Sequence, residues 1–242
     1  MKTRTVRSAI AVLVFLSAPG CGGSSEIDTL RGELALVKED LANLRMSLGR
    51  PRATVALDDV RQRGNPDAQV ALVEFSDYEC PFCRRHFSQT MPLIEEQYIA
   101  TGRILYAFRD FPIDELHPQA IKAHEAAQCG LEQGRYWQMH NMLFGAPEEH
   151  SVDGLEATAT KAGLNMDAFR ECIASGRTTE AIRKTASQAA GFGANGTPAF
   201  FVGFVDKAAN QITVAQAMSG ALPFETFSQV IDAAIAQVGS KN

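Results

Sequence analysis

The stretch "EFSDYECPFCRRHF" (residues 74–87) carries two cysteines, Cys80 and Cys83, on either side of a Pro-Phe pair. An apolar run precedes the pair, and a basic segment with helix-forming residues follows it. Pro81 suits the first position of a helix, because the N–H that proline lacks would have no intrahelical partner there. The spacing therefore predicts a strand, a short loop and a helix that begins at the first cysteine.

The two cysteines are expected to differ in chemistry. At the helix N-terminus, unpaired backbone N–H groups and the positive end of the helix dipole would stabilise a thiolate on Cys80. Cys83, one turn further along, is expected to face the sheet. The pattern thus favours an exposed nucleophile, Cys80, and a sheltered resolving thiol, Cys83.

Two other uses of the pair are less well supported. A structural zinc site would need two more ligands, but there is no second C-x-x-C, and the nearest histidine, His86, is expected on the helix surface. An inert disulfide between positions i and i+3 would close too short a loop to add much stability. We therefore expect a redox pair and no bound metal.

The rest of the chain predicts an α/β core with a helical insertion. "QVALVEFS" (69–76) is typical of a central strand, residues 81–98 of a helix kinked at Pro92, and residues 103–111 of a second strand. Helical patterns follow throughout residues 113–192. Strand patterns then return at 199–205 and 211–218, before a final helix at 223–238. Core residues 57–112 and 193–242 would flank the helical insertion 113–192.

The N-terminus predicts export. A basic start and the apolar run at residues 9–18 resemble a signal peptide over residues 1–20, and ten residues fall short of the roughly 20 that span a membrane. Cys21 with the following "GGSS" resembles a bacterial lipoprotein cleavage box, although Ala18 stands where that family usually has leucine. We expect a lipid on Cys21 and a tether at 21–26. The alternative is a soluble exported protein. In both cases the protein works in the cell envelope, outside the cytosol, where disulfides persist.

Residues 27–48 predict a coiled-coil stalk. Apolar residues recur every three and four positions, which is the heptad pattern. Acidic residues at g and basic residues at e favour a parallel homo-oligomer, whereas the alternative is one amphipathic helix against its own domain. A linker at 49–56 would follow the stalk. The seam consists of Ile27, Leu34, Leu41 and Leu48 at a, and Leu30, Val37 and Leu44 at d.

Net charge limits the partners. Loss of residues 1–20 removes three of the 23 Lys and Arg side chains and leaves 28 Asp and Glu, a net charge of −8. A surface of that sign offers no electrostatic attraction for nucleic acid or anionic lipid. The expected membrane contact is therefore the N-terminal lipid, and no nucleic-acid partner is expected.

The combination "LVEFSDYECPFC", the distant "GTP" at residues 196–198 and the helical block between them resemble the DsbA-like thiol–disulfide oxidoreductases of the thioredoxin superfamily. The resemblance covers roughly residues 57–238. It implies a thioredoxin fold with an inserted all-helical domain. It also implies that Pro198 forms a cis peptide bond beside the cysteines, with Thr197 presenting its backbone to a substrate peptide. Pro81 and Phe82 would complete the substrate-binding surface.

Glu74 is the unexpected residue in the apolar strand. An unpaired buried charge is costly, and a neutral carboxyl with a raised pKa avoids that cost; a strand glutamate solvated at the sheet edge is the alternative. The resemblance implies that an acid at this position transfers protons to and from the inner thiol. One difference from the family concerns Phe82, because the strongest oxidants have histidine there. The Cys80–Cys83 disulfide is thus expected to be less oxidising.

The two remaining cysteines, Cys129 and Cys172, lie in the helical block. Relatives with a second, structural disulfide have cysteines in comparable segments, so the resemblance implies a bridge between them, whereas two separate buried thiols are the alternative. Trp137 and its aromatic neighbours are expected in the core of the insertion. No motif surrounds His117, His124 or His140, so no site is expected there.

These patterns predict a thiol–disulfide oxidoreductase that acts on exported proteins without a bound cofactor. A membrane redox partner would reset the Cys80–Cys83 pair. One alternative is an oligomeric isomerase or reductase, which the stalk and Thr197 would suit. An alternative of another class is a carrier of a soft metal such as Cu(I) on the two thiolates; the lack of an adjoining methionine or histidine cluster disfavours it.

Overall fold

The computed structural model describes residues 34, 38, 53–57, 61–146 and 150–240. The chain divides into two compact units, Met1–Pro51 and Arg52–Asn242. The expected signal peptide, the lipidation of Cys21 and nearly all of the stalk at 27–48 lie outside the described residues. They stay predictions.

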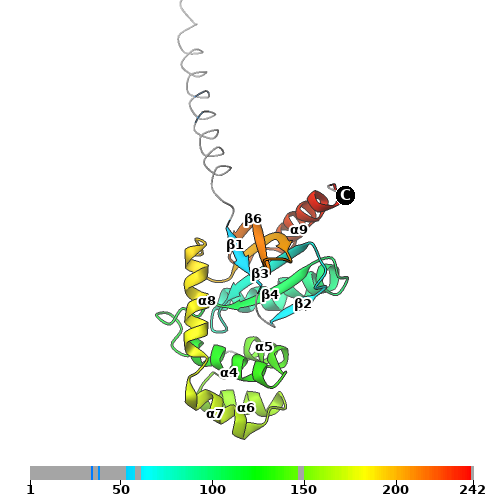
Figure 1. The fold of residues 1–242 in the computed structure, drawn as a ribbon. Helices are drawn as coiled ribbons and strands as arrows, with labels where there is room; N and C mark the ends of the chain where they lie inside the picture. The colour runs from blue at the N-terminus through cyan, green and yellow to red at the C-terminus, as the bar shows by residue number, and fades with distance from the viewer. Residues whose placement is uncertain (1–33, 35–37, 39–52, 58–60, 147–149, 241–242) are drawn as a thin grey trace, which may run out of the picture. The chain divides into compact units, whose positions relative to one another are not determined.

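A six-stranded sheet organises the second unit (Figure 1). Its order is β1-β6-β5-β3-β4-β2. The pair β3 and β4 is parallel, and every other neighbouring pair is antiparallel. The strands are β1 (Thr54–Ala56), β2 (Gln62–Gly64), β3 (Val70–Ser76), β4 (Leu105–Asp110), β5 (Ala199–Asp206) and β6 (Gln211–Ser219).

Strand β3 occupies the middle of the sheet, as its sequence predicts. All seven of its residues are buried, because β4 and β5 pair with its edges and helices cover both faces. The sequence did not predict β1 or β2. Each has three residues, too few for an alternating pattern, and β1 lies in the segment 49–56 that we expected to be a linker.

The helix after the cysteine motif is not one regular α-helix. It consists of α2 (Pro81–Arg85), the π-helical turn η1 (His86–Thr90), α3 (Met91–Ile94) and a second π-helical turn, η2 (Glu95–Ile99). Pro92 has no N–H to donate to the carbonyl of Ser88, so regular α-helical bonding cannot continue through this point. The irregularity expected at Pro92 therefore takes the form of a π-turn that precedes it.

Residues after β4 form a block of helices. Side chains cap two of them: the Ser151 hydroxyl accepts from Gly154 N at 3.2 Å, and the Asn165 carbonyl oxygen accepts from Ala168 N at 3.0 Å, as N-cap residues do. Figure 1 shows α4 to α7 gathered at one end of the sheet, with α8 extending from them alongside it. The block comprises α4 (Ala120–Glu132), α5 (Tyr136–Gly145), α6 (Val152–Lys161), α7 (Met166–Ser175) and α8 (Thr179–Gly191); α9 (Phe224–Gly239) ends the described fold.

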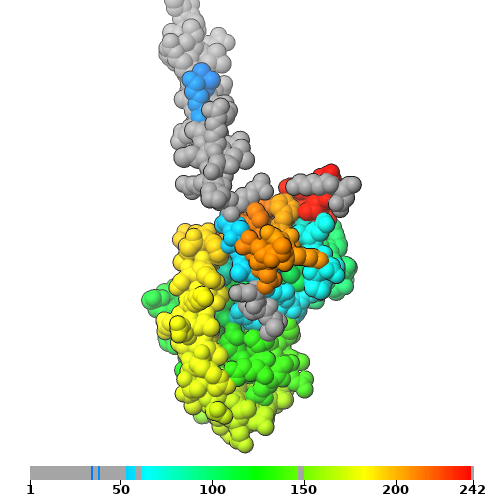
Figure 2. Space-filling view, in the orientation of Figure 1, coloured from blue at the N-terminus to red at the C-terminus, as the bar shows by residue number. Residues whose placement is uncertain are grey.

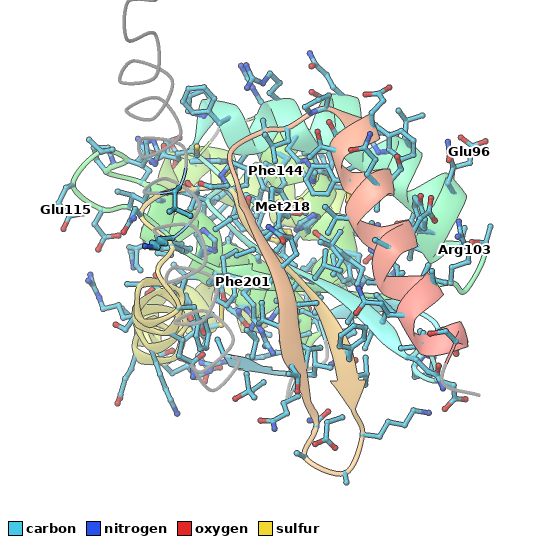
Figure 3. All side chains as sticks on the ribbon, turned by 90° about the horizontal axis from the view of Figure 1, so that it is seen from above. Glu96, Arg103, Glu115, Phe144, Phe201 and Met218 are labelled. Atoms are coloured by element: carbon cyan, nitrogen blue, oxygen red, sulfur yellow. A yellow bond between two sulfur atoms is a disulfide. The ribbon has the colours of Figure 1, made fainter. Side chains whose placement is uncertain are left out.

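Two apolar clusters fill the two faces of the sheet. The first joins alternate residues of β3, such as Leu72, to α9 and to the helices α4 to α7. The second joins the other face of β3, including Phe75, to Ala189 of α8. Figure 3 labels one member of each, Phe144 and Phe201. The space-filling view shows α8, in yellow, forming a continuous surface over its side of the unit (Figure 2).

A buried ionic network ties β4 to the helical block. The Asp110 carboxylate at the end of β4 pairs with Arg61, and it lies 2.6 Å from His124 Nδ1 and 2.6 Å from Gln128 Nε2, both of α4. Burial alone would raise the pKa of Asp110, but Arg61 and His124 hold it below its ordinary value. His124 thus has a structural contact that the sequence did not reveal.

A disulfide between Cys129 and Cys172 joins α4 to α7, with the two Cα atoms 5.8 Å apart. Both cysteines are buried. The cross-link spans 43 positions of sequence, so it holds together two helices that enclose the first apolar cluster.

Candidate active site

Cys80 and Cys83 lie at the start of α2. Cys80 is the N-cap residue, with extended backbone angles (φ −70°, ψ 122°), and Pro81 follows at the first helical position. Both cysteines are free thiols in this structure. Cys83 is wholly buried against the sheet, whereas 4% of Cys80 is exposed. The expectation of an exposed Cys80 is therefore wrong.

The segment before β5 accounts for part of that cover. The Thr197 carbonyl accepts a hydrogen bond from the Cys80 thiol, with 3.4 Å between sulfur and oxygen. The Thr197–Pro198 peptide bond is cis. Because Ala199, at the start of β5, pairs with Phe75 of β3, the sheet register brings Thr197 to Cys80 across 117 positions of sequence.

The two thiols have opposite proton affinities. Hydrogen bonds from the Cys83 thiol and from the backbone N–H groups of Cys83 and Phe82 outweigh burial and lower the pKa of Cys80 to about 6. Burial raises the pKa of Cys83 well above its ordinary value, and the adjacent Cys80 adds to the effect. Near neutral pH the pair therefore holds a thiolate at the helix N-terminus and a neutral thiol beneath it.

Glu74 lies on β3, the strand that leads to the cysteine motif, and is buried. The Tyr106 hydroxyl donates to its Oε2 atom at 2.8 Å. Burial raises the pKa of Glu74 to about 7, while Tyr106, Ser76 and Arg63 oppose the rise. Because β4 and β5 pair with both edges of β3, the alternative of an edge-solvated glutamate is wrong.

His86 is also buried, so the expectation of a helix-surface residue is wrong. Its ring packs against Phe200 and Phe227, with centroid distances of 4.5 and 5.1 Å. Its Nε2 atom lies 3.6 Å from Oε2 of Glu74. The position three residues after Cys83 places both side chains on one helix face, which is the signal that could have predicted its burial.

Two residues that the sequence assigns to substrate binding, Pro81 and Phe82, are exposed beside the cysteine pair. Pro81 is exposed, and Phe82 is 53% exposed, with the Arg85 guanidinium 5.3 Å from its ring centroid. Such a bare aromatic ring beside a reactive thiol offers an apolar contact to an incoming chain. Trp137 packs against the first apolar cluster, away from this surface.

The loop before the cysteine motif is held by one buried carboxylate, that of Asp77. Asp77 accepts hydrogen bonds from the backbone N–H of Glu79 and of Ile113, each at 2.8 Å, and its Oδ2 atom lies 2.8 Å from His117 Nδ1. Tyr78 lies 3.1 Å from His140 Nδ1. Asp77 therefore fixes the approach to Cys80, a role that the sequence alone did not suggest.

Two features of other classes of protein, a metal-binding cluster and a membrane-spanning helix, are missing from the described residues. No group of three or more His, Cys, Asp or Glu side chains in these ranges could hold a metal ion. Nor does any helix there combine the length and the apolar character needed to cross a bilayer.

Solved structures share this architecture. α-DsbA1 of Wolbachia pipientis is 26% identical, with a TM-score of 0.68 over 77% of this chain and 96% of that one. A thioredoxin-like oxidoreductase of Silicibacter pomeroyi is 25% identical, with a TM-score of 0.61 over 74% and 95% of the two chains. BdbD of Bacillus subtilis, at 17% identity, supports the fold alone, with a TM-score of 0.61 over 77% and 100%.

These likenesses, together with the site geometry, define the class: a thioredoxin-like fold that is similar to the DsbA-like thiol–disulfide oxidoreductases. The chain belongs to the thioredoxin family, because the family model Thioredoxin_4, described as "Thioredoxin", matches residues 57–233.

Curated relatives are longer proteins that are named as Na(+)/H(+) antiporters. The Na(+)/H(+) antiporter NhaA 3 of Salinispora tropica is 34% identical over 72% of this chain, but the match covers 26% of that protein. The corresponding protein of Salinispora arenicola is 35% identical over 58% of this chain and 21% of its own length. The chain thus spans about a quarter of the length of these relatives. Ion transport belongs to the names of those longer proteins and is not assigned to this chain.

The first prediction concerns Glu74. Its pKa is about 7 in the folded protein against an ordinary value of 4.5, so the folded state binds the proton more tightly. The contribution of Glu74 to the free energy of unfolding should therefore be largest below pH 4.5, and about 3 kcal/mol of it should be lost as the pH rises through 7. Glu74→Gln should remove that part of the fall. Denaturant unfolding at a series of pH values measures it.

The oxidised protein suits this measurement, because its active-site cysteines cannot titrate. Glu225→Gln, a change at an exposed helix residue, is the matched control and should keep the wild-type pH profile. Parallel profiles for the wild type and Glu74→Gln would show that Glu74 does not titrate in this range.

Proposed function

We propose that the protein forms or exchanges disulfides in exported proteins, with Cys80 and Cys83 as its redox pair. The observation that carries the proposal is the asymmetry of the two thiols. The pKa of Cys80 is lowered to about 6, and that of the buried Cys83 is raised. A low pKa makes Cys80 a good leaving group as well as a thiolate at neutral pH, which is what disulfide donation requires.

In the oxidising direction, a substrate thiolate attacks the Sγ atom of Cys80. The Cys80–Cys83 bond breaks, a mixed disulfide forms between substrate and Cys80, and Cys83 leaves with the electron pair. A second substrate thiolate then attacks the substrate sulfur, and Cys80 leaves as a thiolate. The substrate loses two electrons to the pair, and a membrane redox partner takes them up to restore the disulfide.

Glu74 supplies the proton for the first step. The Cys83 thiolate is formed in a buried position where the neutral thiol is favoured. With its pKa raised to about 7, the Glu74 carboxyl is protonated in a large fraction of molecules at neutral pH, so it can act as a general acid. In the reverse direction, its carboxylate accepts the proton of Cys83.

Pro81, Phe82, Thr197 and Pro198 form the proposed substrate surface. Phe82 offers an exposed apolar ring. The Thr197 carbonyl accepts from the Cys80 thiol in this structure; once Cys80 has lost its proton, that oxygen can accept a backbone N–H of the substrate. This would hold an extended peptide next to the reactive sulfur.

We further propose that the protein is exported, carries a lipid on Cys21 and forms a parallel homo-oligomer through residues 27–48. Leu34, at an a position of the heptad, is helical and 53% exposed in the single chain, so a second copy could cover it. Several active sites around one substrate would favour isomerisation, the second candidate function.

A Cu(I) carrier is less well supported. Thiolates are the ligands that Cu(I) prefers, but burial keeps Cys83 protonated, with a pKa well above its ordinary value. Binding by both sulfurs would therefore begin with an unfavourable loss of the Cys83 proton.

The second prediction assigns roles to the two thiols. Cys80→Ser should abolish oxidation of a reduced peptide, because Cys83 then has no partner with which to form the disulfide that is donated. Cys83→Ser should accumulate mixed disulfides through Cys80, because the resolving thiol is missing. Peptide mapping after acid quench measures both. If alkylation of the reduced, folded protein labels Cys83 before Cys80, the roles are reversed.

The third prediction concerns the stalk. Removal of residues 21–52 takes away the first residue of the second compact unit, Arg52, and keeps the rest of that unit. This variant should be a monomer that still oxidises a reduced peptide but loses most of any ability to reshuffle a scrambled disulfide protein. Sedimentation should show the ectodomain with its stalk as a dimer or trimer. Monomers in both cases would contradict the coiled coil and remove the main support for an isomerase.

A further inference from the structure

Glu74 and His86 face each other across the space between the sheet and the helix that carries the cysteine pair. Glu74 extends from the central strand β3, and His86 begins the π-helical turn η1, three residues after Cys83. Both are buried. The Nε2 atom of His86 and Oε2 of Glu74 are 3.6 Å apart, so a small movement of either side chain would bring them within hydrogen-bonding distance.

The surroundings of His86 are otherwise apolar. Its ring lies between Phe200 of β5 and Phe227 of α9. Within the described residues, neither ring nitrogen has a hydrogen-bond partner. A buried polar atom without a partner costs about 1–3 kcal/mol, and a phenylalanine would fill this aromatic site without that cost. Packing alone therefore does not explain a histidine here.

The groups that face Glu74 come from each neighbouring element. Tyr106 of β4 donates to Oε2, Ser76 of β3 shares the same face of the strand, and Arg63 of β2 acts through its charge. Ser76 also acts on the thiol of Cys83, on α2, so it connects the two groups. From β5 and α9 come the two phenylalanine rings that hold His86.

We propose that His86 is a positioning residue for Glu74, and that its Nε2–H stabilises the Glu74 carboxylate whenever that carboxyl has given its proton to Cys83. The pairing itself follows from the geometry of this cluster. Its use in disulfide exchange rests on the proposed function.

The chemistry requires a partner that suits both states of the carboxyl. As the Cys80–Cys83 bond breaks, the Cys83 sulfur takes the electron pair and then the Glu74 proton, which leaves a buried carboxylate. Tyr106 offers that carboxylate one donor. With its proton on Nε2, neutral imidazole can donate to an oxygen of the carboxyl group in either state, and the bond is stronger to the carboxylate, so His86 serves before and after the transfer. Reversal returns the proton from the Cys83 thiol to Glu74 as Cys83 attacks Cys80.

Burial lowers the pKa of His86 to about 3, which keeps the ring neutral near pH 7. A neutral ring donates through one nitrogen only, and the nitrogen nearer the carboxylate is Nε2. The pair as a whole therefore carries one exchangeable proton and does not become a fixed ion pair.

The fourth prediction uses His86→Phe. The new ring fits between Phe200 and Phe227 and removes two unpaired nitrogens, so the variant should fold with at least wild-type stability. The Glu74 carboxylate would lose a donor, so its titration midpoint should lie about one pH unit above the wild-type midpoint, a tenfold change in proton affinity. Carbon-13 NMR of the labelled Glu74 carboxyl measures this without any substrate.

Kinetics should show the same shift in one step only. The rate at which Cys83 resolves a mixed disulfide at Cys80 should move to higher pH by the same amount, while the pH dependence of Cys80 alkylation should stay as in the wild type. His86→Gln, whose amide can donate, should restore much of the wild-type profile. Phe227→Leu, which alters the packing around the ring without removing a donor, is the matched control and should titrate as the wild type does.

An unchanged Glu74 midpoint in His86→Phe would overturn the pairing and make His86 a core residue. A shifted midpoint in a protein that lacks exchange activity would support the pairing while contradicting the proposed function. A shift of equal size in Phe227→Leu would also overturn the pairing, because packing alone would then account for it.

Discussion

The N-terminus of α2 stabilises negative charge on one sulfur, while the sheet beneath it excludes charge from another sulfur one turn away. Cys80 caps the helix and has a lowered pKa, whereas the buried Cys83 has a raised one. Because a disulfide and two thiols interconvert through a single thiolate at a time, this difference sets the order of events at the site. The rest of the unit can be understood as what holds the two sulfurs in these environments.

Burial of β3 is the first requirement. Its place between β4 and β5 buries Glu74 and Ser76 within the sheet, and the same pairing brings Thr197 over Cys80. Asp77 then fixes the loop between strand and helix through backbone N–H groups from both sides. A surface loop carrying the same two cysteines would have no reason to distinguish them, because solvent would equalise their surroundings.

Local pattern predicted much of this arrangement. The apolar run before Cys80 predicted the central strand, and Pro81 predicted where the helix begins. The burial of Glu74 and its raised pKa followed from one charged residue among apolar ones. What the sequence did not show depends on contacts between distant residues. Arg61 pairs with Asp110 across 49 positions, and the cover over Cys80 comes from Thr197, 117 positions away.

His86 and the short strands illustrate two different reasons for error. His86 follows two arginines, so composition suggested an exposed helix face, whereas its spacing from Cys83 sets the buried one. Strands β1 and β2 are too short for periodicity to reveal, and pairing with β6 and β4 creates them. In both cases the surrounding fold decides the local structure.

The most direct test compares the free energies of unfolding of the reduced and oxidised protein at pH 6, 7 and 8. The Cys80 thiolate stabilises only the reduced folded protein. Its folded pKa is about 6 against an ordinary 9.0, so this stability is complete above the unfolded pKa and is lost as the pH falls through 6. Neither cysteine is among the groups that set the pKa of Glu74, so the titration of Glu74 cancels between the two forms. Between pH 6 and pH 8, the free energy of unfolding of the reduced protein should rise by about 1–2 kcal/mol relative to that of the oxidised protein, after solvent screening. A difference that stays constant or falls over this range would contradict it.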